Sequence, residues 1–111
     1  MNDNKKIGEK PQIEYYKAAG IDMVRIPYEI TEISPSIYSW RELSVKFINF
    51  NYGGLVSSLI GLKYSPAEMT AVVNNYLLDP EDEETKIEFT KMQDARKEAK
   101  AIAHWIMNEY K

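Results

Sequence analysis

Residues 21–33 read Ile-Asp-Met-Val-Arg-Ile-Pro-Tyr-Glu-Ile-Thr-Glu-Ile, and the fold class depends on this stretch. Its second half alternates apolar and polar side chains, as an extended chain with one buried face does. Pro27 lies inside the alternation and argues against a central strand, because proline has no N–H to donate to a neighbouring strand. We therefore predict an extended arm packed on helices, with a short edge strand as the alternative.

The chain before this stretch predicts little regular structure. Residues 1–10 are polar and charged and lack the apolar core of a secretory signal, so we expect a disordered tail. Residues 12–19 are compatible with a short helix that ends at Gly20. We expect residues 11–111 to form a single helical domain.

Two later segments share one pattern, which is typical of a helix start. They are residues 38–43, Tyr-Ser-Trp-Arg-Glu-Leu, and residues 64–69, Tyr-Ser-Pro-Ala-Glu-Met. In such a capping box the serine accepts from a first-turn N–H, the glutamate bonds back to the serine N–H, and the flanking apolar residues pack together. Pro66 strengthens the second start. Capping chemistry explains the match, and an ancient internal duplication is the alternative.

These starts and the glycines that follow them divide the middle of the chain into three predicted helices. The first begins at Ser39 and ends at Tyr52-Gly53-Gly54. The second covers residues 55–62, ends near Gly61 and is apolar enough to be buried all round. The third covers residues 66–78.

The last predicted helix opens at Asp79-Pro80 and continues to Tyr110. Asp79 is the expected N-cap and Pro80 the first helical residue, while the acids that follow complement the helix dipole. No Gly or Pro follows Pro80, and a one-sided apolar stripe runs through Met92, Ala95, Ala99, Ile102, Ile106 and Tyr110. The predicted fold is therefore an all-α, single-domain bundle of four to five helices, with a long C-terminal helix and an extended N-terminal arm.

Composition excludes several classes of protein. The chain has 111 residues, is 44% hydrophobic and 28% charged, carries a net charge of −3 and contains no cysteine. It therefore has no disulfide, thiolate nucleophile or Cys-ligated metal centre. Its mildly acidic balance disfavours broad attraction to nucleic acid or anionic lipid. We expect a cytoplasmic protein without a membrane span, cofactor or small-molecule ligand.

No set of residues stands out as a catalytic or metal-binding centre. His104, the single histidine, has Lys100 and Asn108 as its i−4 and i+4 neighbours and so lacks a carboxylate to orient it. The acidic run at residues 79–84 lacks the ligand spacing of a calcium loop. We assign no catalytic, cofactor-binding or metal-binding residue and expect a non-enzymatic protein. The rival enzyme class would need carboxylates gathered from separate helices.

The last helix points to protein binding. From Pro80 to Tyr110 it would be about 46 Å long, against a diameter of about 34 Å for a compact domain of this size. Its end therefore either breaks or packs on another chain. The candidate interface is the apolar face formed by Ala99, Ile102, Trp105, Ile106 and Tyr110, and burial within the same chain is the alternative.

We predict a small interaction or assembly factor that acts by self-association or by binding a protein partner. A phage or mobile-element assembly protein would fit its size and build. The alternative is a helix–turn–helix DNA-binding regulator that uses residues 55–62 and 66–78. That reading exposes Glu68, Thr70, Asn74 and Asn75 on the second helix, but this helix has no Lys or Arg to contact phosphate, so nucleic acid is not the expected partner.

Overall fold

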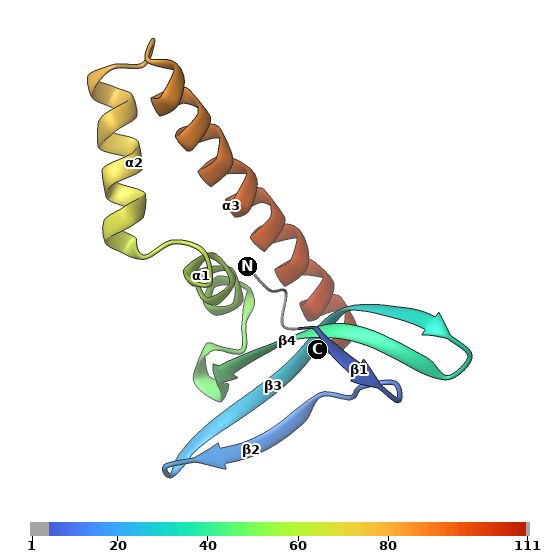
Figure 1. The fold of residues 1–111 in the computed structure, drawn as a ribbon. Helices are drawn as coiled ribbons and strands as arrows, with labels where there is room; N and C mark the ends of the chain where they lie inside the picture. The colour runs from blue at the N-terminus through green and yellow to red at the C-terminus, as the bar shows by residue number, and fades with distance from the viewer. Residues whose placement is uncertain (1–4, 111) are drawn as a thin grey trace. The chain divides into compact units, whose positions relative to one another are not determined.

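The computed structural model describes residues 5–110 and has an α+β fold. Helices hold 51% of the residues and strands 30%, so the predicted all-α helical bundle is wrong. Figure 1 shows the elements in chain order: β1 (Lys6–Gly8), β2 (Glu14–Ala18), β3 (Ile21–Ser34), β4 (Ile37–Lys46), the 3₁₀ turn η1 (Phe47–Asn49), α1 (Tyr52–Gly61), α2 (Pro66–Leu78) and α3 (Glu83–Tyr110).

The chain divides into two compact units. One holds the strands and η1, up to Asn51, together with the residues from Ile106 onward; the other is Tyr52–Trp105, which holds α1, α2 and most of α3. The expected boundary after residue 10 falls between β1 and β2 of the sheet. Residues 1–4 of the expected tail lie outside the described residues.

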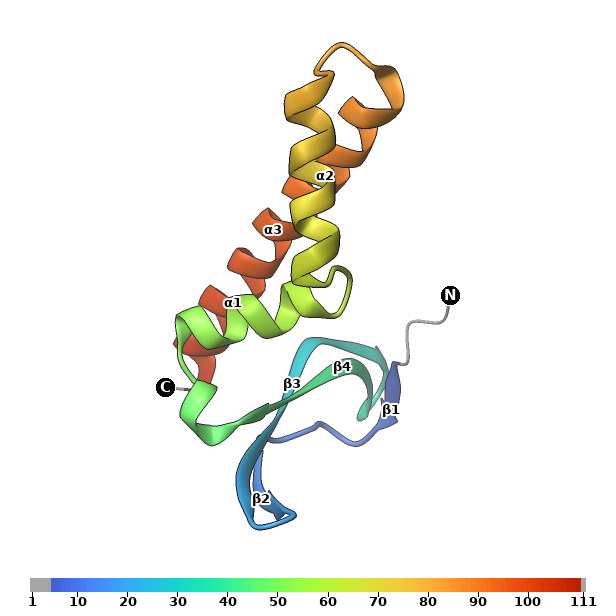
Figure 2. The ribbon, with the colours of Figure 1, turned by 90° about the vertical axis from the view of Figure 1, so that its left-hand side faces the viewer.

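The strands form one antiparallel sheet in the order β1-β4-β3-β2 (Figures 1 and 2). β2 and β3 are joined by Ala19 and Gly20, whose φ angles of 51° and 77° are both positive, as in the type I′ turn that suits a tight hairpin. Gly20 therefore makes a hairpin turn, and the short helix predicted over residues 12–19 is wrong. Its residues pair as β2 because the turn brings them beside β3.

Pro27 lies in β3, which is a central strand, contrary to the prediction of an arm or an edge strand. The pair Ala18 and Ile21 closes the hairpin turn and exchanges backbone hydrogen bonds. Along an antiparallel ladder every second pair does so, and the next such pairs lead to Glu14 and Arg25. Arg25 therefore directs its backbone N–H and C=O toward Glu14. By the same alternation the backbone groups of Pro27 point toward the β2 side of β3, where the β2–β3 pairing has already ended at Glu14. The missing N–H therefore costs no ladder bond, and the Pro27 carbonyl accepts from the Tyr110 hydroxyl at 2.9 Å.

The predicted helix from Ser39 is wrong, because residues 37–46 form β4. In a strand, side chains alternate between two faces, so Ser39 and Glu42 cannot close a capping box. One face of β3 and β4 is apolar instead, and its buried members are Val24, Ile26, Tyr28, Leu43 and Val45. These residues form the core of the strand unit.

The helices of the second unit match the sequence better. α1 ends at Gly61 as predicted but begins at Tyr52, so Gly53 and Gly54 lie in its first turn and do not end a helix. It buries Leu55, Leu59 and Ile60, while Ser57 is exposed, so it is not buried all round. α2 has the predicted bounds.

The capping box of α2 is complete. The Glu68 N–H donates to Ser65 Oγ at 3.1 Å, and the Ser65 N–H donates to Glu68 Oε1 at 2.8 Å. Donation from the Ser65 N–H to the carboxylate, and in second place a hydrogen bond with the Ser65 side chain, hold the pKa of Glu68 below its ordinary value.

α3 begins at Glu83 and not at Pro80. The Asp79 N–H donates to the Asn75 carbonyl at 3.1 Å and so closes α2. Asp82 is the actual cap of α3, because its carboxylate accepts from the Thr85 N–H at 2.9 Å, which lowers the pKa of Asp82. Pro80 belongs to the turn between the helices, where its fixed φ is equally suitable. The predicted acidic N-cap therefore exists, but it is Asp82, three residues after the predicted Asp79.

Candidate interaction surface

α2 and α3 form an antiparallel hairpin within the second unit (Figures 1 and 2). Near its outer end the Tyr76 and Phe89 rings stack, with centroids 4.2 Å apart and planes at 10°. At its other end Lys63 Nζ lies 3.7 Å from Glu98 Oε2. Tyr76 comes after Lys63 in the chain, but its partner Phe89 comes before Glu98. The two helices therefore run in opposite directions.

The apolar side chains of α2 are poorly covered. None of its 13 residues is buried, although most of them are apolar. Leu77 is 70% exposed and Leu78 84%, and Ile87 on α3 is 54% exposed. A surface helix usually hides one apolar face against its own domain. In α2 the apolar residues Met69, Val72, Val73 and Tyr76 are only half-buried, and Leu77 and Leu78 are exposed.

Two hollows flank the contact between α2 and α3. One, of about 240 Å³, is lined by Met69, Thr70, Val73, Asn74, Met92 and Arg96. The other, of about 320 Å³, is lined by Ala71, Val72, Asn75, Glu84, Thr85 and Glu88. We call these the Met69 side and the Glu84 side. Helical spacing places Leu77, four residues after Val73, on the Met69 side and Leu78, three after Asn75, on the Glu84 side.

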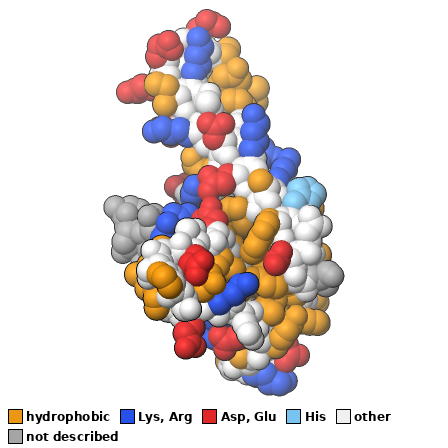
Figure 3. Space-filling model, turned by 90° about the vertical axis from the view of Figure 1, so that its right-hand side faces the viewer, with side chains coloured by type: hydrophobic (Ala, Val, Ile, Leu, Met, Phe, Trp, Pro, Cys, Tyr) orange, Lys and Arg blue, Asp and Glu red, His pale blue; other side chains and the backbone are white. Residues whose placement is uncertain are grey.

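The two sides differ in charge. Glu84 and Glu88 both line the Glu84 side, whereas Arg96 is the single charged residue lining the Met69 side. Figure 3 shows acidic side chains at the outer end of the hairpin, with Lys and Arg side chains interspersed among them and further along it. Leu77, Leu78 and Ile87 are not among the residues predicted from the sequence, although the apolar run Tyr76-Leu77-Leu78 directly before the acidic turn was a signal for the first two.

The chain itself covers most of the interface predicted on the last helix. Ala99 is 3% exposed and Ile106 0%, Ile102 is half-buried, and the half-buried Tyr110 is bonded to the Pro27 carbonyl. Trp105, at 38% exposure, presents the largest remaining apolar surface. Partner binding by this face stays a prediction.

The DNA-reading residues of the alternative hypothesis are partly engaged. Glu68 is held in the capping box, and the Thr70 hydroxyl donates to the Pro66 carbonyl at 3.0 Å. Asn74 and Asn75 are exposed but line different sides of the hairpin. DNA binding by α2 stays a prediction.

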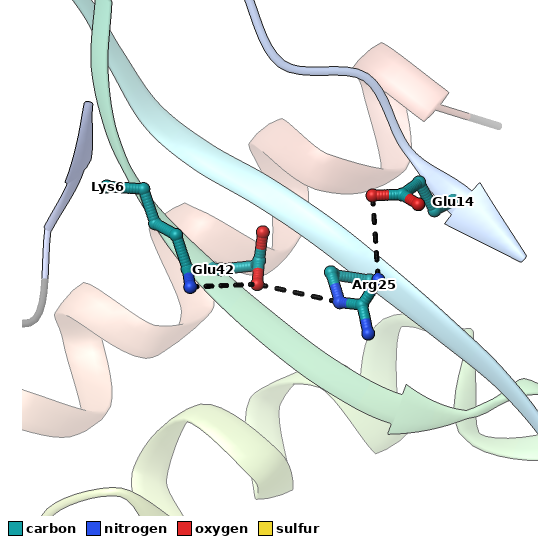
Figure 4. Close-up of polar contacts among 4 residues, drawn as sticks. All are labelled: Lys6, Glu14, Arg25 and Glu42. Carbon is teal, nitrogen blue, oxygen red and sulfur yellow. Dashed lines mark ion pairs between the residues drawn. The ribbon is translucent and has the colours of Figure 1, made fainter. Parts of the chain in front are cut away.

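Charged residues on the sheet pair with one another across the strands. Glu42 Oε1 lies 3.9 Å from Lys6 Nζ and 3.6 Å from Arg25 Nε, and Arg25 Nη1 lies 3.5 Å from Glu14 Oε1 (Figure 4). The series links β1, β4, β3 and β2. Each partly exposed pair is worth little alone, but together the pairs favour one strand register.

Other candidate centres have simple structural surroundings. His104 is exposed and its ring lies against Tyr52, with centroids 4.4 Å apart. Among residues 5–110, His, Asp and Glu side chains do not gather in threes as a metal site requires. In the same part of the chain, no helix is both long and apolar enough to cross a membrane.

Comparison with protein-family models, with curated proteins and with solved structures finds no match.

Proposed function

We propose that this chain is a non-catalytic, cytoplasmic protein-interaction factor that self-associates through the α2–α3 hairpin. The observation that carries the proposal is the apolar helix α2, none of whose residues is buried. Exposed contiguous apolar surface on a small protein marks a site of association. Two antiparallel helices become a stable four-helix bundle when a second hairpin packs against them.

The Met69 side is the better surface for a second copy. In a two-fold dimer the same patch of both chains meets, so a patch with like charges repels its counterpart. The Glu84 side would bring two acids of each chain together, whereas the Met69 side offers the half-buried Met69 and Val73 and has Arg96 as its single charged lining residue. Met92, which is 1% exposed, adds almost no surface. Leu77 extends this apolar surface toward the outer end of the hairpin.

The test is the solution mass measured by light scattering after size exclusion at two concentrations. The expected result for the natural chain is twice its 12.9 kDa. Leu77→Glu should give a monomer, because it buries a charge in the interface. Leu78→Glu is the matched control, since the same substitution at the next residue, also exposed, falls on the other side of α2 and should leave the dimer intact.

Three outcomes count against the proposal. A monomer at both concentrations contradicts self-association, and dissociation by both substitutions contradicts the assignment to the Met69 side. Absorbance at 260 nm that reports carried nucleic acid, with duplex binding lost in Asn74→Ala, would favour the DNA-binding alternative.

A further inference from the structure

The outer edge of β2 is open. β2 is the last strand in the order β1-β4-β3-β2, and among the described residues no strand lies beyond it. Ala18, Tyr16 and Glu14 direct their backbone groups toward β3, by the alternation that starts at the hairpin turn. The backbone N–H and C=O groups of Tyr15 and Lys17 therefore point outward. Such a row of unpaired groups is a template for another strand.

This edge is held in place before anything binds. Arg25 contacts both Glu14, at 3.5 Å, and the face of the Tyr16 ring, at 4.3 Å from its centroid. At the other end of the strand Lys17 Nζ lies 3.1 Å from Asp22 Oδ1. Since both ends of β2 are tied to β3, pairing with a further strand costs little additional ordering of this chain.

An apolar hollow lies beside the edge. It measures about 360 Å³ and is lined by Tyr15, Tyr16, Lys17, Asp22, Met23 and Phe47. The Tyr15 ring packs edge-on against Phe47, with centroids 6.1 Å apart, and the two residues are 59% and 52% exposed. The two charged lining residues, Lys17 and Asp22, neutralise each other, so the hollow suits an uncharged apolar side chain.

We propose that the outer edge of β2 binds an extended segment of a partner protein as a fifth strand, with an apolar side chain of that segment in the hollow beside Tyr15 and Phe47. Only another extended backbone presents donors and acceptors at the spacing of Tyr15 and Lys17. A second copy of β2 paired antiparallel about Tyr16, the centre of the strand, fits poorly, because this register sets Lys17 of the copy opposite Tyr15 and so brings a charge to the apolar hollow. The inference stands independently of the hairpin dimer.

The experiment uses the full chain and a panel of nine-residue peptides in which Val, Leu, Ile, Phe or Tyr alternates with Thr. Peptides with Ser at the apolar positions are the controls. Amide hydrogen exchange followed by NMR is the readout. An apolar peptide should slow exchange of the Tyr15 and Lys17 amides by about tenfold or more, while the Tyr16 amide, already bonded to β3, changes little.

Two variants separate backbone pairing from simple apolar contact. Lys17→Pro removes the outward N–H and blocks the edge, whereas Lys17→Ala loses the same ion pair but keeps the N–H. Lys17→Pro should bind the peptide about tenfold more weakly than Lys17→Ala. Phe47→Ala, at a half-exposed position outside the core, should also weaken binding. Leu77→Glu should bind as the natural chain does, which distinguishes this site from the hairpin surface.

Several results overturn the proposal. These are unchanged exchange at Tyr15 and Lys17 with every apolar peptide, equal binding by Lys17→Pro and Lys17→Ala, or equal binding by the Ser peptides. Protection of the two amides without peptide, rising with protein concentration and lost in Lys17→Pro, would assign the edge to a second copy.

Discussion

The Tyr110 hydroxyl satisfies a carbonyl that the sheet leaves unpaired. Pro27 is buried, and its carbonyl lies on the side of β3 where the β2 ladder has ended. The bond to Tyr110, at 2.9 Å, joins residues 83 positions apart and anchors the end of α3 within the strand unit. Partial burial, and to a smaller degree the charge of Glu109, raise the pKa of the Tyr110 hydroxyl.

Tyr110→Phe should therefore lower the free energy of unfolding by about 1 kcal/mol at neutral pH, since a buried carbonyl loses its donor. The raised pKa adds a pH dependence. Below about pH 10 the tyrosine is neutral in both the folded and the unfolded chain, so its contribution is complete. At higher pH the unfolded chain ionises first, and stability falls.

The measurement is urea unfolding between pH 7 and pH 11 for both proteins. The natural chain should lose stability above about pH 10 more steeply than Tyr110→Phe does, because the other tyrosines titrate in both. Parallel curves would show that the hydroxyl does not support the fold.

At the scale of elements, one local motif had two outcomes. The pattern Ser-x-x-Glu occurs at Ser39 and at Ser65, yet the first lies in β4 and the second caps α2. Pro66 favours the first turn of a helix, whereas residues 42–45, Glu-Leu-Ser-Val, alternate in the period of a strand, with Leu43 and Val45 on the buried face. The competing period was visible in the sequence, but a capping box looks the same in either context.

Ser65→Ala and Ser39→Ala form a matched pair that tests this distinction. Ser65→Ala should lower the free energy of unfolding by about 1 kcal/mol, since a first-turn N–H loses its acceptor. Ser39→Ala should change it by less than about 0.5 kcal/mol, because Ser39 caps no helix. Urea unfolding followed by circular dichroism measures both. Equal losses would contradict the assignment of residues 37–46 to a strand.

For the whole molecule, sequence signals within a few residues of one another predicted the elements that local contacts form, which are the helices. The bounds of α2, the end of α1 and most of α3 follow from caps, glycines and one-sided apolar spacing. The sheet depends on pairs such as Lys6 with Trp40, which no local period reveals. The sequence did not reveal the exposed surface of α2 either, because the exposure of Leu77 depends on how α2 and α3 pack as a hairpin.

The strand unit includes the last turn of α3, from Ile106 onward. Ile106 is fully buried and belongs to the same compact unit as the sheet, although it lies on α3. Ile106→Ala should lower the free energy of unfolding by about 2–4 kcal/mol through the cavity it leaves. Ile87→Ala is the control, since it removes the same atoms from the same helix at a residue that is 54% exposed, and it should cost less than about 1 kcal/mol.

Amide exchange decides whether Ile106 supports the sheet as well as the helix. In Ile106→Ala the amides of Val24 and Val45, which pair with each other across β3 and β4, should exchange faster, because the core that holds those strands has lost a member. In Ile87→Ala they should not change. Faster exchange confined to α3 would mean that the sheet does not depend on the Ile106 side chain. The predicted decrease in the free energy of unfolding would then come from the helix alone.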